Sequence, residues 1–277
     1  MSTQVDSTLA LATSPRKGRR LKVKRRNTRG AGRMLVGLLP LVLGLALWEA
    51  LGTDQSFSFP RPSSWWAAAS DMWQAGELAP ALRRTVLTFV LGLSASIVVG
   101  SALGWLIGAS TRFHQALNPI LEFIRSTPSV AIVPVATVLF GVSMRMSIVV
   151  MLTAIIWPVL LSTTTARRTI TPVRLEMGHV VGLSRSDQMR KVVFPSLLPA
   201  IMTGTRVSAS QGLIIALIID IIGSGEGIGR VLVEKQQLYE AASVWALMVI
   251  IGLLGLVANG LVGAVDSYVQ RGWRTES

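Results

Sequence analysis

Six long apolar segments constrain the fold of this chain more than any other feature. They cover residues 34–51, 86–109, 120–140, 146–161, 207–222 and 244–265, and each contains at most two charged side chains. A helix needs about 20 apolar residues to cross about 30 Å of hydrocarbon, so these segments have roughly the length of membrane spans. Only 15% of all residues are charged, against about 25% in soluble domains. The sequence therefore predicts an all-α, polytopic membrane protein with about six transmembrane helices.

Basic residues are distributed unevenly along the chain. Of the 27 Lys and Arg residues, ten lie in the run 16–33, and seven lie between Arg167 and Arg206. Counting the loops alternately from a cytoplasmic N-terminus places 20 basic residues inside and six outside, and cytoplasmic loops are the ones enriched in Lys and Arg. We therefore expect both termini in the cytoplasm. The net charge of +13 comes with no RNA-binding motif, so we expect no nucleic acid partner.

The chain divides into five predicted parts. Residues 1–33 are a basic disordered tail, 34–52 the first transmembrane helix, 53–82 an external segment, 83–270 a core of five transmembrane helices, and 271–277 a cytoplasmic tail. In the external segment, Trp65, Trp66, Met72 and Trp73 recur at helical spacing. This pattern favours a short amphipathic helix on the membrane surface, with an aromatic cluster that contacts solute as the alternative. The first apolar segment also resembles a secretory signal, but no small-residue cleavage site follows it.

A polar stretch of about two dozen residues interrupts the apolar pattern between the fourth and fifth segments. Thr171–Pro172 is a typical helix start, and Gly182 is well placed to end that helix. Ser184 followed by Asp187 predicts the start of a second helix, which Pro195 would limit or kink. We expect a helix, a glycine corner and another helix on the cytoplasmic side, and such a rigid elbow indicates a docking partner.

The same stretch resembles a known motif. Glu176, Gly182, Val192, Phe194 and Pro195 keep the spacing E-A-A-x-x-x-G-x9-I-x-L-P, which marks the coupling loop of integral-membrane permeases of binding-protein-dependent ABC importers. The likeness covers about residues 83–270 and is greatest to the branch that serves nitrate, sulfonate, taurine and pyrimidine-precursor uptake. Met177 and Gly178 replace the two alanines, and a helical glycine costs about 1 kcal/mol relative to alanine. The elbow is therefore expected to be softer than usual, or to use Met177 as an adaptable apolar contact.

The resemblance implies the role and the partners of the chain. It implies a permease subunit in a prokaryotic inner membrane that carries a small polar solute, with two ATP-binding cassette ATPase subunits, a second permease copy and an extracytoplasmic solute-binding protein. ATP and Mg would bind to the ATPase, and this chain would bind no cofactor and would not be an enzyme. Within a coupling loop over 166–206, it assigns the contact with the ATPase to Glu176, Met177, Gly182, Leu183 and Pro195. Of the apolar side chains there, we expect Leu175, Met177 and Leu183 to form the docking face.

Two charged residues inside apolar segments are candidates for the translocation pathway, because a charge in hydrocarbon is expensive. Asp220 follows seven apolar residues, and it either contacts solute in the outer half of the cavity or makes a structural hydrogen bond to a neighbouring helix. Arg125 either faces the pathway or pairs with Glu122 one turn away. The glycine-rich run 223–229 lacks the spacing of a phosphate loop, so we expect a turn that touches the solute receptor.

Other functions find less support in the sequence. The chain has no cysteine, and its two histidines, His114 and His179, lie far apart, so no metal or catalytic cluster is predicted. A membrane-embedded lipid-modifying enzyme would need such a cluster. A secondary transporter would be expected to show paired internal repeats with broken helices, and none is evident.

Overall fold

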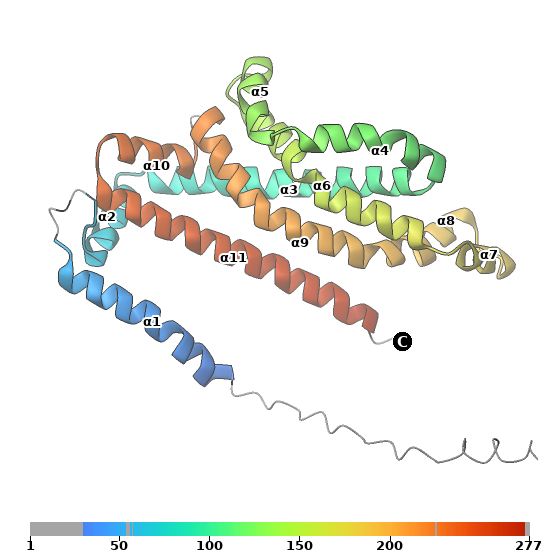
Figure 1. The fold of residues 1–277 in the computed structure, drawn as a ribbon, viewed down its shortest axis with the longest axis horizontal. Coiled ribbons are helices and arrows are strands. Elements are labelled where there is room, and N and C mark those ends of the chain that lie inside the picture. The colour runs from blue at the N-terminus through green and yellow to red at the C-terminus, as the bar shows by residue number, and fades with distance from the viewer. Residues whose placement is uncertain (1–29, 54–55, 57, 225, 275–277) are drawn as a thin grey trace, which may run out of the picture. The chain divides into compact units, whose positions relative to one another are not determined.

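A computed structural model of the chain describes residues 30–274 apart from 54, 55, 57 and 225 (Figure 1). Most of the predicted basic tail, and positions 275–277 of the predicted C-terminal tail, lie outside the described residues. Within the described residues every regular element is a helix, which confirms the all-α prediction. The elements are α1 (Gly30–Leu51), α2 (Pro62–Gln74), α3 (Leu78–Gly108), α4 (Thr111–Ser126), η1 (Ser129–Ala131), α5 (Ile132–Phe140), α6 (Met144–Thr169), α7 (Pro172–Val180), α8 (Arg185–Gln188), η2 (Met189–Val193), α9 (Phe194–Ile219), η3 (Asp220–Ser224), α10 (Ile228–Gln237) and α11 (Ala241–Arg274).

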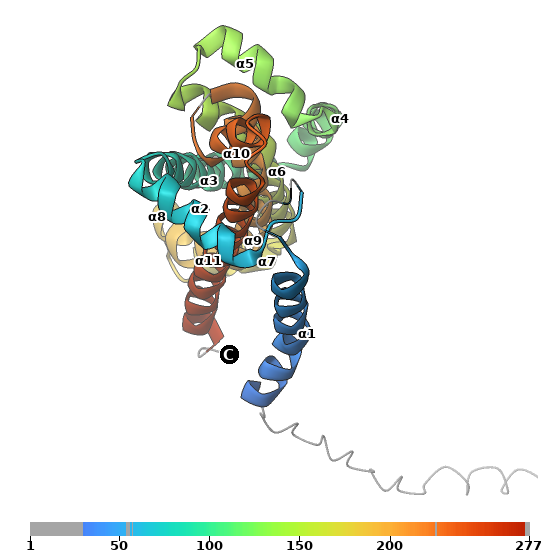
Figure 2. The ribbon, with the colours of Figure 1, turned by 90° about the vertical axis from the view of Figure 1, so that its left-hand side faces the viewer.

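The chain consists of two units, residues 1–47 and 48–277, and all the features described below belong to the second. Its centre is formed by α3, α6 and α9, with α11 packed against α9 (Figures 1 and 2). Glycines let these helices approach closely. A Cβ atom on Gly104 would lie 2.6 Å from the backbone oxygen of Leu160, and one on Gly204 would lie 2.7 Å from that of Pro158. Small residues at helix contacts are typical of packing within membranes, where no hydrophobic effect drives helices together.

Four helices in the described part of the chain are long and apolar enough to cross a membrane: Leu78–Gly108, Met144–Thr169, Arg185–Gly223 and Ala241–Val269. They contain the second, fourth, fifth and sixth predicted spans. The third predicted span, 120–140, is not one straight helix, because α4 and the η1–α5 segment meet at 73°. Pro128 explains the break, since a proline disfavours the helical conformation in the preceding residue, and Thr127 is extended with ψ of 127°.

The fifth span begins much earlier than predicted. The helical segment runs without interruption from Arg185 to Gly223, whereas the sequence places the start of the span at Val207. Pro195 therefore does not end the second elbow helix. Instead, the backbone widens into the π turn η2, in which the Phe194 N–H bonds to the Met189 carbonyl. A wider turn is a known way to fit a proline, whose ring and missing N–H disrupt the normal ladder.

The start of α2 is anchored by aromatic and polar contacts. The rings of Trp65 and Trp245 stack with centroids 5.3 Å apart, and Trp48 packs edge-on against both. The Glu49 carboxylate accepts hydrogen bonds from the backbone N–H and the hydroxyl of Ser63. The helix expected within 53–82 is thus observed, and its position on a membrane surface stays a prediction.

Candidate functional site

The elbow between α6 and α9 is the first candidate site, and its corner is stabilised by backbone hydrogen bonds. Gly182 has φ of +79°, a conformation that only glycine adopts readily. This allows the Leu183 N–H to bond to the Gly178 carbonyl and the Gly182 N–H to the His179 carbonyl, both at 2.9 Å. Together these bonds form a Schellman motif, a standard helix ending. The predicted role of Gly182 as the helix end is confirmed.

The second part of the elbow starts with a side-chain cap. The Ser184 hydroxyl accepts a hydrogen bond from the Asp187 N–H at 3.1 Å and donates one to the Asp187 carboxylate at 2.8 Å. Lys191 lies 3.3 Å from the same carboxylate, one turn further along. These contacts confirm the helix start predicted from Ser184 and Asp187.

Gly178 permits a close contact between the two parts of the elbow. The Gln188 side-chain amide donates to the Leu175 carbonyl at 2.5 Å, and a Cβ atom on Gly178 would lie 2.9 Å from that amide nitrogen. Gly178 is buried in this contact. The elbow is therefore held together where its helix was expected to be softer, since the glycine makes room for the side chain that connects α7 to α8.

A cluster of exposed apolar side chains covers the outer side of α7. Val173, Met177, Val180 and Val181 are 62%, 65%, 87% and 77% exposed, and the first three share a helix face because they are spaced by four and three residues. We call these four residues the elbow patch. Contiguous exposed apolar side chains on a polar segment mark interaction sites.

Of the three apolar side chains expected to form the docking face, Met177 is exposed, whereas Leu175 and Leu183 are half-buried. Leu175 packs against the buried cluster that contains Ile170 and Leu197, and Leu183 is half-buried at the corner. Leu175 is therefore partly covered by the packing of the elbow against α6 and α9. Glu176 is exposed beside the patch, whereas Pro195 is half-buried in the first turn of α9.

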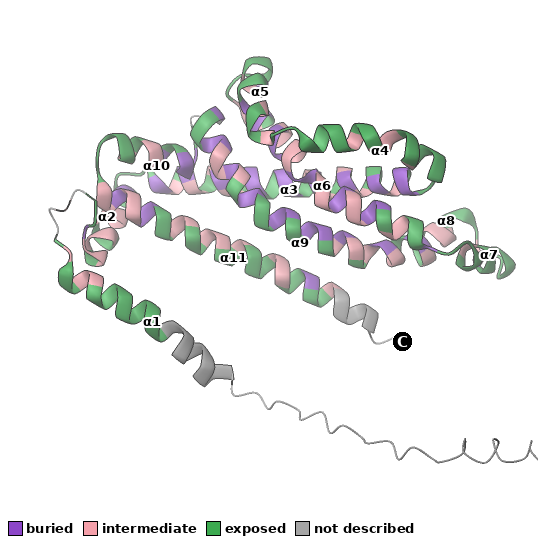
Figure 3. Ribbon diagram, in the orientation of Figure 1, coloured by how far each residue is buried: buried purple, intermediate pink, exposed green. Residues whose placement is uncertain are grey.

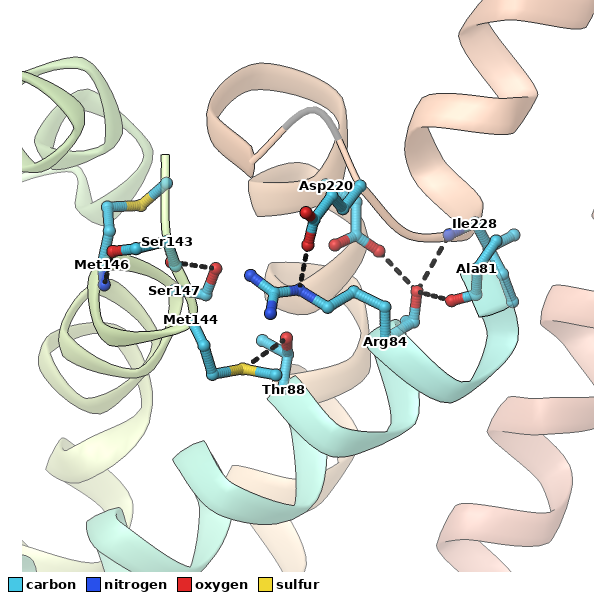
Figure 4. Close-up of polar contacts among 11 residues, drawn as sticks. Ala81, Arg84, Thr88, Ser143, Met144, Met146, Ser147, Asp220 and Ile228 are labelled. Atoms are coloured by element: carbon cyan, nitrogen blue, oxygen red, sulfur yellow. Dashed lines mark hydrogen bonds and ion pairs between the residues drawn. The ribbon is translucent and has the colours of Figure 1, made fainter. Parts of the chain in front are cut away.

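Asp220 lies at the other end of α9 and is almost completely buried, with 1% exposed (Figure 4). Its carboxylate accepts a hydrogen bond from the Thr85 hydroxyl of α3 at 2.5 Å. The same hydroxyl accepts from the Ile228 N–H at the start of α10 at 2.9 Å. Gly227, with φ of +96°, passes directly over the carboxylate, so that a Cβ atom there would clash with it. Asp220 thus joins α3, η3 and α10, and its charge favourably meets the N-terminus of α10.

We call Asp220, Thr85 and Ile228 the Asp220 group. Ion pairs join charged side chains of α3, α10 and the segments that flank these helices. Arg84 Nε lies 3.0 Å from the Glu226 carboxylate, and Lys235 lies 3.3 Å from Glu77 and 3.4 Å from Glu240. Burial lowers the pKa of Lys235, but its hydrogen bonds to the two glutamates outweigh burial, so the pKa lies above its usual value. Of the glycine-rich run expected to form a turn, Gly223 lies in η3, Gly229 lies in α10, and Gly227 lies between the two elements with φ of +96°. A cavity of about 650 Å³ adjoins Gly227 and is lined by Glu77, Arg83, Arg84, Glu226, Arg230 and Glu234 among others.

Arg125 lies in the last turn of α4, two residues before the break at Thr127. The side chain is exposed, as is that of Glu122. Among the ion pairs of the described residues, none joins Arg125 to Glu122. The structure therefore does not support the alternative in which Arg125 pairs with Glu122. Arg125 is suitably placed to interact with the partial negative charge at the C-terminus of α4.

Arg206 was assigned to a cytoplasmic loop from the sequence, and the structure places it well inside α9. Its charge ended the apolar run, so the predicted span started one residue later. The side chain is 67% exposed and lies 3.9 Å from the Asp266 carboxylate of α11. The signal that could have identified it is the polar series Thr203, Arg206 and Ser210, which recurs at helical spacing.

Across the described residues, no group of three or more His, Cys, Asp or Glu side chains is arranged to hold a metal ion. The elbow lies at one end of α9, where α7 is largely exposed (Figure 3). The buried and hydrogen-bonded Asp220 lies at the other end of α9. Helix α9 connects the two directly.

Residues 96–271 match the family described as "Binding-protein-dependent transport system inner membrane component". The chain belongs to this family of transport permeases. The match includes the elbow, Arg206 and Asp220, and it starts somewhat later than the resemblance predicted. Membership makes this permease a multi-pass membrane component of an ABC importer, a system that also has ATPase and binding-protein partners. It does not favour the secondary transporter or the lipid-modifying enzyme.

Individual relatives agree with the family. The permease is 29% identical over 193 residues to the nitrate import permease protein NrtB of Leptolyngbya laminosa, covering 70% of this chain and 68% of that one. It is 25% identical over 240 residues to the putative aliphatic sulfonates transport permease protein SsuC of Bacillus subtilis, covering 86% of each. Among solved structures, an inward-facing MetNI methionine ABC transporter matches with a TM-score of 0.61 and 16% identity, over 71% of this chain and 97% of that one. At that identity the likeness shows the fold alone.

Proposed function

We propose that this permease is driven through its elbow by a separate ATPase, and that it imports a small polar solute delivered by a binding protein. Two ATPase subunits would bind and hydrolyse ATP with Mg²⁺, and a second permease copy would complete the pathway. Both chain termini would lie in the cytoplasm of a prokaryotic cell, on the same side as the elbow. The observation that carries the proposal is the exposed elbow patch on a corner that is itself well ordered by hydrogen bonds.

The elbow has the composition of an interface. Its centre is apolar, and its surroundings carry exposed charges, namely Glu176, Arg185, Arg190 and Lys191. Protein interfaces commonly combine an apolar core with a polar rim, and the rim charges favour the correct partner. We expect a groove on the ATPase to receive Met177 and Val180, with complementary charges beside it.

The connection from the elbow to α9 offers a way to transmit movement. Because α8, η2 and α9 form one continuous helical segment, a rotation of the elbow would rotate α9 with it. Helix α9 is 26 residues long, so it carries that movement over about 39 Å. At its far end, the movement would reach the Asp220 group.

The Asp220 group is proposed to close the outer end of the pathway, where the solute receptor would dock against the glycine-rich turn. A hydrogen-bonded carboxylate that joins three elements can hold them in one arrangement and release them in another. Arg125, exposed beside the break between α4 and η1, is proposed to face the pathway. For the solute, the relatives support a small polar molecule such as nitrate or a sulfonate, with pyrimidine precursors as the further expectation of the resemblance.

A direct test starts from native membranes that contain the permease and its partners. Purification through a tag on the permease should recover an ATPase subunit, and Gly182→Asp should abolish ATP-driven uptake, because aspartate disfavours a φ of +79° and would misplace the elbow. Gly252→Ala is a suitable control, since a Cβ atom there meets nothing within 4 Å. Recovery of no ATPase, together with normal uptake by the Gly182→Asp protein, would refute the proposal.

A further inference from the structure

The exposed face of α9 carries several polar side chains beside the apolar Val207 and Ile214, although the helix is a membrane span. Thr203, Arg206 and Ser210 are exposed and spaced by three and four residues, and Gln211 is exposed beside them. The opposite face of the same helix is buried and includes Ile201, Ala209 and Ile219. The hydroxyls of Thr203 and Ser210 lie within hydrogen-bonding distance of carbonyls of their own helix. The Arg206 guanidinium needs water or polar partners, because lipid cannot satisfy a charged group.

The contacts of α9 with α6 fix the depth of Arg206. Two residues before it, Gly204 lies against Pro158, and two residues after it, Ser208 donates to the Ile155 carbonyl at 2.7 Å. Arg206 is therefore level with residues 155–158, which are near the middle of the 26-residue helix α6. A guanidinium at that depth is costly in lipid and is a functional candidate by default.

Helix α11 supplies polar neighbours to this face. Ser210 donates to the Asn259 side-chain oxygen at 3.0 Å, and the Arg206 guanidinium lies 3.9 Å from the Asp266 carboxylate. A separation of 3.9 Å is long for a charge-assisted hydrogen bond, which is about 2.7–2.9 Å. Since Arg206 has five N–H donors and its side chain is 67% exposed, most of its hydrogen-bonding capacity faces outward from α9.

We propose that Arg206 and Ser210 form a binding subsite for a small oxyanion on the translocation pathway. The planar guanidinium matches the geometry of nitrate, carboxylate or sulfonate oxygens. The single proton of the Ser210 hydroxyl, one turn away, lies within reach of the Arg206 carbonyl and the Asn259 side-chain oxygen, and it would turn to the anion when the anion binds. Asp266 holds the guanidinium in place and limits its attraction for anions, so that the solute is released again. This inference rests on the proposed import function, and it narrows the solute class from small polar molecules to oxyanions.

The sequence offers a convenient way to probe this face, because the chain contains no cysteine. A permease with Ser210→Cys carries a single thiol beside Arg206, whose labelling can be followed on the permease by mass spectrometry. The assembled complex in proteoliposomes would be treated with the anionic thiosulfonate MTSES and the cationic MTSET. Val98→Cys is the control, since Val98 is exposed on α3 among apolar residues and should face lipid.

We expect both reagents to label Ser210→Cys and neither to label Val98→Cys. The ratio of the MTSES rate to the MTSET rate should fall about tenfold when Arg206→Gln is added, because a neighbouring positive charge attracts one reagent and repels the other. Arg206→Lys should preserve the ratio. If Arg206→Gln protein fails to assemble, Asp266→Asn serves instead and should raise the ratio, since it removes the opposing charge. A thiol at position 210 that does not react, or a ratio that these changes leave unaltered, would overturn the proposal.

Uptake measurements separate this inference from the proposed function. With the ATPase and the receptor present, ATP-driven import of nitrate or ethanesulfonate should show a KM at least about tenfold higher in Arg206→Gln. If Arg206→Gln and wild type import the solute equally well, the proposed subsite would be refuted and the proposed import function would stand. No ATP-driven import of any solute by the wild-type complex would refute the import function, whatever the labelling shows. Import of only neutral or cationic solutes would overturn the oxyanion assignment alone.

Discussion

Replacing Met177 and Val180 by serine should weaken the binding of the ATPase to the permease while the elbow stays folded. Both side chains are exposed, at 65% and 87%, and neither takes part in the backbone bonds that end α7. Full burial of a Val or Met side chain is worth about 1.5–3 kcal/mol. Since interfaces desolvate side chains incompletely, we expect the pair to contribute about 2 kcal/mol, which corresponds to about 30-fold weaker binding.

The affinity can be measured by titrating purified ATPase onto the permease in nanodiscs. Leu238→Ser is a matched control, because Leu238 is 60% exposed and lies after α10, at the far end of the bundle from the elbow (Figure 1). The Met177→Ser, Val180→Ser permease should fail to stimulate ATP hydrolysis at low concentrations of the ATPase subunit. At high concentrations of that subunit, the stimulation should return. Unchanged affinity for the Met177→Ser, Val180→Ser protein, or an equal loss for Leu238→Ser, would refute the assignment of the elbow patch.

Two further predictions concern the packing and the far end of α9. Gly204→Ala should lower the free energy of unfolding of the permease by about 1–3 kcal/mol, because its Cβ atom would meet the backbone of Pro158 at 2.7 Å. An unfolding temperature in detergent equal to that of wild type would contradict this packing. Asp220→Asn should weaken the connection between α3 and α10 by about 1.5–3 kcal/mol, the value of a hydrogen bond to a charged group, and should increase solute-independent ATPase activity. Wild-type values of stability, ATPase activity and uptake would show that the Asp220 charge has no role.

The helices and the capping of the elbow could be predicted from local rules. Thr171, Gly182 and Ser184 occupy the positions expected of them, because helix ends depend on a few neighbouring residues. The exposure of the apolar side chains on the elbow could be predicted only in part. Whether Leu175 or Val180 is exposed depends on how α7 folds back against α6 and α9, which periodicity over nine residues does not determine.

The errors in the membrane spans have different causes. Hydropathy runs continuously through 120–140, so it could not show that Pro128 turns the chain by 73°. The position of Arg206 was predicted wrongly because its charge interrupts the apolar run. The sequence therefore placed it in a loop, although the helix continues on both sides of it. For Asp220 the sequence left two explanations open. The hydrogen bond from Thr85 could not be predicted, because Thr85 is 135 residues away in the chain and only the fold brings it next to Asp220.

The central claim is that the ATPase contacts the elbow and moves α9 through it. Cross-linking from the elbow to the ATPase tests this contact most directly. A single thiol introduced by Val180→Cys would carry a maleimide–diazirine probe, and illumination of the complex in native membranes should join the permease to the ATPase subunit. The same probe at Leu238→Cys should capture no ATPase. Capture of the ATPase from position 238, or its absence from position 180 in a complex that transports solute, would contradict the account.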